Sequence, residues 1–179
     1  MFILQSHKEI LTNEMYHDCK EANEYRFPVS FQHTLYLKDL PFLVTLENNV
    51  PVHVQPLTCI GDIFYIYVDR VTPGVLSSLR MLLNGYINIH KFNYQVVCKP
   101  EGRDVSIPAL YYGFTIPKEL STMEHLTTVM SEKIAKTQLD TIASLKEGQE
   151  LVMQWSPKED LVDYFVDAGF NFANVTYQL

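Results

Sequence analysis

His125 begins an H-x-T element, a pattern that phosphodiesterases with two histidines use when paired imidazoles act as general acid and base across a phosphate. That chemistry needs a second such element on a facing strand. Neither His33 nor His53 has a hydroxyl residue two positions later. A helix-start signal at Ser121 also places His125 in the first turns of a helix. We therefore interpret His125 as a surface histidine and keep a phosphoesterase as the third functional hypothesis.

Glu14 and His17 have the i, i+3 spacing with which one helix supplies a carboxylate and an imidazole to a di-metal site. A second pair of this kind would be needed, and none occurs elsewhere in the sequence, so a solvated polar face is the favoured interpretation. The sequence also lacks a phosphate-binding glycine loop, a G-x-S-x-G elbow, a C-x-x-C pair and an H-E-x-x-H helix. We therefore assign no catalytic residue, no metal ligand and no cofactor from the sequence.

The composition is that of a folded globular chain, with 179 residues and 47% hydrophobic residues. Lys and Arg number 14 against 21 Asp and Glu, which gives a formal charge of −7. A nucleic-acid binder usually presents a broad basic field, so we expect no nucleic-acid partner.

The cysteines are odd in number and widely spaced, which matches neither a disulfide framework nor a zinc site and favours free thiols in a reducing compartment. They are Cys19, Cys59 and Cys98. The apolar residues before Lys8 are too few for a signal-peptide core, and no run approaches the roughly 18 apolar residues of a membrane span. We expect a cytoplasmic protein that is not secreted through a signal peptide and does not enter a membrane.

Helix-start signals predict four helices. A serine followed three residues later by a glutamate forms a capping box, and such boxes begin at Ser6, Ser121 and Ser156. Thr72 precedes a proline at a first helical position. With the apolar spacing, these signals predict helices over 7–24, 73–84, 122–146 and 157–168, the second and fourth ending at Gly85 and Gly169. The apolar stripe of the first helix is Leu11, Met15, Cys19 and Ala22.

Runs rich in β-branched and aromatic residues predict eight strands, at 33–38, 42–46, 50–57, 62–69, 87–98, 109–116, 150–155 and 174–178. Asn48 and Asn49 form an expected turn between the second and third strands. The first half of the chain therefore predicts an antiparallel meander, and the second half predicts strand-helix-strand units. Together they predict a single α+β domain over 1–179, with a mixed sheet.

The chain from about 109 to 179 runs in the order strand 109–116, helix from Ser121, strand 151–155, and a helix that closes on Gly169 and Phe170. This order resembles the second half of a GNAT-type N-acetyltransferase domain, in which a short helix carrying an aromatic residue closes on Gly-Phe before the final strand. The resemblance implies an acetyl-CoA enzyme with Tyr164 as general-acid candidate.

The family holds the acetyl-CoA pyrophosphate with backbone amides of a glycine-bearing turn at a helix N-terminus. The corresponding turn here, 117–123, has no glycine. Two acids, Glu119 and Glu124, lie where the phosphates would bind. The implied cofactor site is therefore degenerate.

The chain is rich in aromatic residues, with 11 Tyr and 10 Phe, and tyrosine gives a protein interface contact area at low entropic cost. Our candidate interaction residues are Tyr65, Tyr67, Tyr111, Tyr112 and Tyr164. The leading hypothesis is a non-enzymatic protein that works through protein contacts or self-assembly, as an assembly subunit, for example of a viral particle, or as an inhibitor. The alternative is a divergent GNAT-like acyltransferase.

Overall fold

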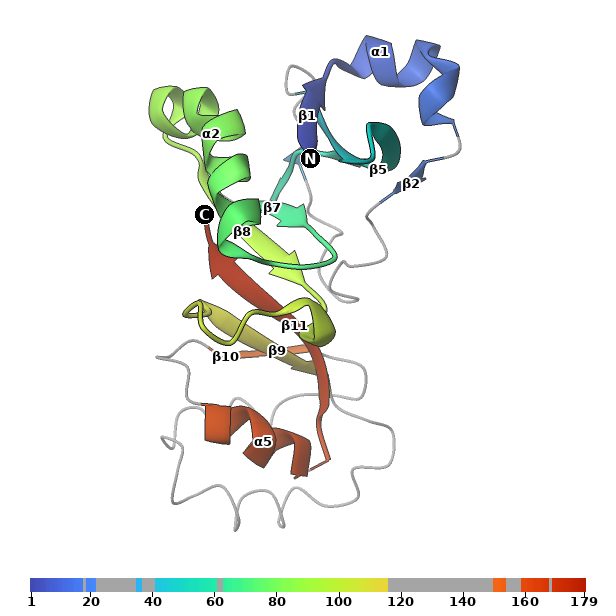
Figure 1. Cartoon of the computed structure of the whole chain (residues 1–179). Coiled ribbons are helices and arrows are strands. Elements are labelled where there is room, and N and C mark those ends of the chain that lie inside the picture. The colour runs from blue at the N-terminus through green and yellow to red at the C-terminus, as the bar shows by residue number, and fades with distance from the viewer. Residues whose placement is uncertain are drawn as a thin grey trace.

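The structure, a computed structural model, describes residues 1–17, 19–21, 35–36, 41–60, 63–115, 150–153, 159–167 and 169–179. They form an α+β fold with two β-sheets (Figure 1). The predicted fold class, α+β with a mixed sheet, is confirmed.

The larger sheet has seven strands, and most of the core lies against it. Its spatial order is β10 (Glu150–Met153), β9 (Tyr111–Thr115), β11 (Asn171–Gln178), β8 (Asn93–Cys98), β7 (Ile63–Tyr67), β6 (Thr58–Ile60) and β3 (Leu35–Tyr36). β7 and β8 are parallel and are joined by the crossover helix α2 (Pro73–His90). β11 is antiparallel to both of its neighbours, β8 and β9. The sheet is therefore mixed, with one strand-helix-strand crossover at its centre.

The smaller sheet has four strands, in the order β1 (Phe2–Gln5), β4 (Phe42–Glu47), β5 (Val50–Pro56) and β2 (Lys20–Glu21). β4 and β5 form a hairpin whose turn residues, Asn48 and Asn49, both have positive φ, as predicted for an Asn-Asn turn. Only Leu57 separates β5 from β6, so the chain passes directly from the smaller sheet into the larger one.

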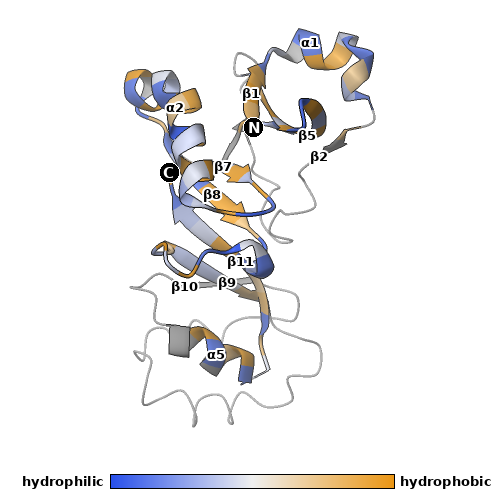
Figure 2. Cartoon of the chain, in the orientation of Figure 1, coloured by the Kyte–Doolittle hydropathy of each residue, from blue (hydrophilic) through white to orange (hydrophobic). Residues whose placement is uncertain are grey.

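The main apolar core joins the two sheets with α2 and α5, and a second, smaller cluster consists of Tyr16, Val44 and Val54. The strands alternate, and their apolar side chains on one face pack under α2 and α5 (Glu159–Asp167). Leu43 from the smaller sheet and Leu57 belong to the same core cluster as Leu79 of α2 and Phe165 of α5. In Figure 2, orange, hydrophobic residues mark β7 and the end of β8.

The first predicted helix is wrong beyond its first turns. α1 covers only His7–Thr12, and a short 3-10 turn, η1 (Glu14–Tyr16), follows. Asn13 separates them, because its side chain accepts a hydrogen bond from the backbone N–H of Met15 at 3.1 Å. Leu11 and Met15, expected in an apolar stripe, are exposed. Ser6 nevertheless caps α1 as predicted, accepting from the N–H of Glu9.

The second helix, α2, is longer than predicted and includes residues 87–90, which were predicted to begin a strand. Thr72 caps it as expected, accepting from the N–H of Val75 at 3.1 Å. Gly85 does not end it, because Tyr86 and Ile87 continue to pack against the core. The helix ends at Lys91, which has φ 54°, and the strand predicted over 87–98 begins only at Asn93.

The C-terminal helix and strand agree well with the prediction. α5 buries Val162 and Phe165, and Gly169 follows it with φ 99°, the left-handed cap expected from the sequence. The helix predicted over 122–146 lies outside the described residues. Among the helices that the structure describes, none is both long and apolar enough to cross a bilayer.

Candidate functional site

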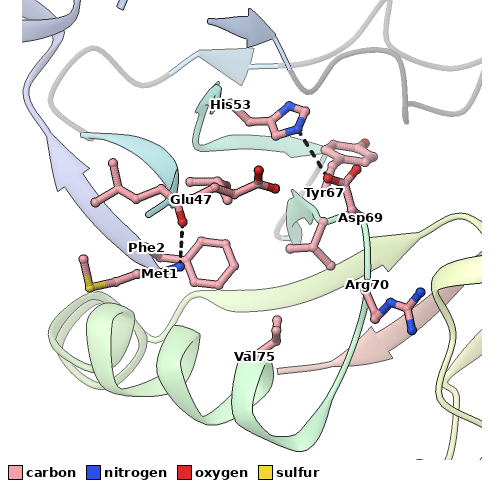
Figure 3. A pocket seen from close by; sticks show the side chains of 11 residues that line it. Met1, Phe2, Glu47, His53, Tyr67, Asp69, Arg70 and Val75 are labelled. Carbon is pink, nitrogen blue, oxygen red and sulfur yellow. Dashed lines mark hydrogen bonds and ion pairs between the residues drawn. The ribbon is translucent and has the colours of Figure 1, made fainter. Parts of the chain in front are cut away.

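A pocket of about 210 Å³ lies where the smaller sheet meets the corner between β7 and α2 (Figure 3). Apolar side chains from both sides line it, including Phe2 of β1 and Val75 of α2. Its polar residues come from three elements: Glu47 ends β4, His53 lies in β5, and Asp69 follows β7. The site is therefore built from segments far apart in the sequence.

Gln55 holds the two walls of the pocket together. Its side-chain amide donates to the carbonyl oxygen of Tyr67 at 2.8 Å and accepts from the N–H of Tyr67 at 2.9 Å. β6 ends its pairing with β7 at Thr58 and Tyr65, so the Gln55 amide takes the place that a neighbouring strand would occupy beside Tyr67. Both residues are buried. This contact fixes β5 against β7 and gives the pocket a defined shape.

Gly102, in the 3-10 turn η4 (Pro100–Gly102), packs against the backbone of the corner that carries Asp69 and Arg70. The N–H of Val71 donates to the Gly102 carbonyl oxygen at 2.8 Å. A Cβ on Gly102 would lie 1.9 Å from the carbonyl oxygen of Asp69, so only glycine permits this approach. The backbone position of Asp69 therefore depends on η4.

His53 and Asp69 face each other across the junction of the sheets, with Nε2 of His53 3.3 Å from Oδ2 of Asp69. A histidine oriented by a carboxylate is a common element of acid-base catalysis. Here Nε2 faces the carboxylate and Nδ1 is buried. The pair therefore joins β5 to the β7–α2 corner and does not present a ring nitrogen to a substrate.

Two described side chains that could act as nucleophiles, Cys98 and Tyr177, are held in their protonated forms. Burial, with a smaller contribution from the nearby Glu101 carboxylate, raises the pKa of the Cys98 thiol to about 12, so Cys98 stays protonated. Burial is also the main cause that raises the pKa of Tyr177 to about 12. Its hydroxyl lies 3.2 Å from the backbone N–H of Asp104 and anchors the loop after η4 to β11. Both groups are structural.

Two of the five tyrosines expected in an interaction patch are not exposed. Tyr67 and Tyr112 are buried, each on a different part of the larger sheet, and Tyr67 lines the pocket. Tyr65 and Tyr111 are partly exposed. The side chain of Tyr164 lies outside the described residues. An exposed patch that includes Tyr67 and Tyr112 is therefore excluded.

Sequence reasoning did not single out Glu47 or Asp69, and considered His53 only as a phosphodiesterase element. A usable signal was present for Asp69, since charged residues between a strand and a crossover helix lie at the edge where open α/β sheets bind ligands.

His125 and the turn 117–123 lie outside the described residues. Within the described part of the chain, Glu14 and His17 belong to no group of three or more His, Cys, Asp or Glu placed to hold a metal ion. No family model, curated protein or solved structure matches this chain. The functional argument therefore rests on the chain's own residues.

Proposed function

We propose that this protein works through contacts with other proteins, as a subunit of an assembly or as an inhibitor, and not as an enzyme. The observation that carries the proposal is the outer face of α2. Met81 and Ile89 protrude from it with 81% and 77% of their surface exposed. Both side chains lie on one stripe of the helix, and apolar residues gathered on one exposed face favour an interface.

The outer face of α2 is also poor in charge. Its exposed residues are Pro73, Gly74, Ser77, Ser78, Arg80, Met81, Asn84, Gly85, Asn88 and Ile89, of which only Arg80 is charged. The Asn88 side chain donates to that of Asn84, so the polar pair on this face is internally bonded. The cores of protein interfaces are depleted in charged residues and enriched in Met. The face matches that composition.

The helix presents this face rigidly. Leu76, Leu79 and Leu83 on its inner side are buried in the core. Gly74, Ser78, Met81, Gly85 and Ile89 follow one another at spacings of three or four residues and so lie along one stripe. Small residues beside Met81 let a partner backbone approach closely. A preorganised surface of this kind loses little conformational entropy on binding.

The test compares wild type with Met81→Lys, using light scattering at tens of micromolar and quantitative co-purification from cell extract. Lysine keeps helix propensity at an exposed position, so the variant should fold. Val105→Lys is the matched control, because Val105 is 74% exposed but lies in the loop after η4. We expect Met81→Lys alone to lose self-association or a stoichiometric partner. A monodisperse monomer with no partner that depends on Met81 would contradict the proposal.

The formal charge of −7 supports a protein partner over a nucleic acid. The buried thiol of Cys98, which forms no disulfide, supports a reducing location, the cytoplasm or a particle assembled within a cell, such as a virus.

A GNAT-like acyltransferase is the second candidate. The observation that favours it is the end of the chain: α5 closes on Gly169 and a buried Phe170 before the final strand β11, as the resemblance implies. Calorimetry with acetyl-CoA tests it. Saturable heat would support the acyltransferase, and no heat at millimolar ligand would remove it.

A further inference from the structure

We propose that the outer face of α2 binds the same face of a second copy of this chain, in an antiparallel pair of helices related by a two-fold axis at Met81. This inference rests on the proposed function, because it names the partner of the interface described above. Figure 1 shows α2 as the outer layer over β7 and β8. The exposure of Met81 and Ile89 leaves its outer face accessible to a second helix.

The side chains along this face match one another in size under such an axis. Ser78 lies three residues before Met81 and Gly85 four residues after it, so the two small residues lie opposite each other in an antiparallel pair. Gly74 lies seven residues before Met81 and Ile89 eight residues after it, so the isoleucine of each copy lies opposite the glycine of the other. The two Met81 side chains meet at the axis. The face is therefore complementary to itself, as a two-fold interface requires.

Gly85 gives an independent reason for a close external contact. Glycine inside a helix is less stable than alanine at the same place. In the part of the chain that the structure describes, no atom would lie within 4 Å of a Cβ added at Gly85. Packing within the described chain therefore does not require glycine here. A second helix that crosses over Gly85 does require it, because a side chain at this position would hold the two helix axes apart.

The distribution of charge favours a second copy over a highly charged partner. Arg80 is the only charged residue among the described exposed side chains of α2, so a highly charged partner would find at most one opposite charge on this face. The same face of another copy is equally poor in charge. Two copies therefore bring few like charges into contact, although each chain has a formal charge of −7. Added salt screens the repulsion between the two chains and should strengthen the pair.

The size of the face predicts a weak dimer. α2 has 18 residues, which at 1.5 Å per residue makes a helix about 27 Å long. One face of such a helix presents less than the ~800 Å² that each partner of a standard complex buries. We therefore expect a dissociation constant of about 10–100 µM, so that dimer replaces monomer only at high protein concentration.

Sedimentation velocity of the full-length chain from about 1 to 500 µM measures the association. Gly85→Gln separates the interface from the fold, because glutamine is a good helix former and has open space at this position within its own chain. It should raise the urea midpoint of the monomer and raise the Kd of the dimer at least about tenfold. A loss of dimer would then not be a consequence of misfolding. Val105→Gln, in the loop after η4, is the control and should leave Kd unchanged.

A charge swap tests the two-fold arrangement. Met81→Lys and Met81→Glu should each stay monomeric alone, because like charges would meet at the axis, and an equimolar mixture should form a one-to-one dimer. The inference is overturned if wild type stays monomeric up to about 500 µM, if Gly85→Gln dimerises as well as wild type, or if the mixture does not pair. If wild type stays monomeric but a stoichiometric partner that depends on Met81 still co-purifies, the second copy is excluded and the proposed function stands. If neither occurs, both fail.

Discussion

Replacing Gln55 with Met should destabilise the protein by about 3 kcal/mol, because the amide of Gln55 joins the two sheets at Tyr67. Methionine keeps the length and approximate volume of glutamine, so packing changes little. The substitution removes two hydrogen bonds, of 2.8 and 2.9 Å, from the backbone of Tyr67, where both residues are almost fully buried. Two bonds contribute about 1 kcal/mol each, and the desolvation of the two backbone groups that lose them raises the cost.

The assay is urea unfolding followed by circular dichroism, with Gln178→Met as the control. Gln178 is an exposed glutamine that donates to the Asn93 side chain and the Tyr94 carbonyl, so its loss should cost less than about 1 kcal/mol. Gln55→Glu keeps an acceptor for the N–H of Tyr67 but places a carboxylate against its carbonyl oxygen. It should be at least as harmful as Gln55→Met at neutral pH. If Gln55→Met lies within about 0.5 kcal/mol of wild type, the sheets are not joined by this amide.

Three further predictions concern the support of the site and the buried titratable groups. Gly102→Ala should lower the free energy of unfolding in urea by about 1–3 kcal/mol, because the new Cβ would lie 1.9 Å from the carbonyl oxygen of Asp69. An unchanged urea midpoint would contradict this close approach. Cys98, whose pKa is raised to about 12, should resist iodoacetamide at about pH 8 in the native protein and react in urea. Mass spectrometry of the labelled peptide measures the reaction, and rapid labelling of the native protein would refute the prediction. The pKa of Tyr177 rises from 10.0 to about 12 on folding, so the folded state holds its proton where the unfolded state has lost it, and stability should fall between about pH 10 and 12. Tyr177→Phe should flatten that part of the stability profile, and an unchanged slope would show that other groups cause it.

The parts of the fold that were predicted correctly are those fixed by local chemistry. Thr72 before a proline marks the start of α2, and Gly169 adopts the positive φ expected of a helix cap. Asn48 and Asn49 form the predicted turn. In each case the backbone conformation follows from one or two side chains and requires no knowledge of distant contacts.

Predictions that depended on tertiary contacts were less successful. The spacing of Leu11 and Met15 is helical, but Asn13 ends the helix between them and both side chains are exposed. Glycine commonly ends a helix, yet α2 continues beyond Gly85 because Tyr86 and Ile87 pack against the core. Packing outweighed local propensity at both places.

The candidate interaction tyrosines also show that exposure depends on tertiary contacts. Ile63–Val68 is a continuous apolar run, the pattern of a strand covered on both faces. Tyr67 lies in that run, so its burial agrees with the pattern, whereas its assignment to an exposed patch relied on aromatic content alone. The outer face of α2 was missed because Ile89 fell in the strand predicted over 87–98 and Met81 was not singled out within the helix predicted over 73–84. The absence of charge around them was the available signal.

The pocket could not be derived from the sequence, since its polar residues meet only after the chain crosses between the sheets. Glu47 and His53 belong to the β4–β5 hairpin, and Asp69 belongs to the crossover that begins with β7. What brings them together is the single residue Leu57 between β5 and β6, and the amide of Gln55 that then fixes the crossing. The crossover also carries the exposed face of α2, so one unit, β7 with α2 and β8, supports both the pocket and the proposed interface. A variant such as Gly102→Ala, which displaces the β7–α2 corner, should therefore disturb the pocket more than it weakens association through Met81, because Gly102 closely approaches Asp69 and Met81 lies more than two helical turns away along α2.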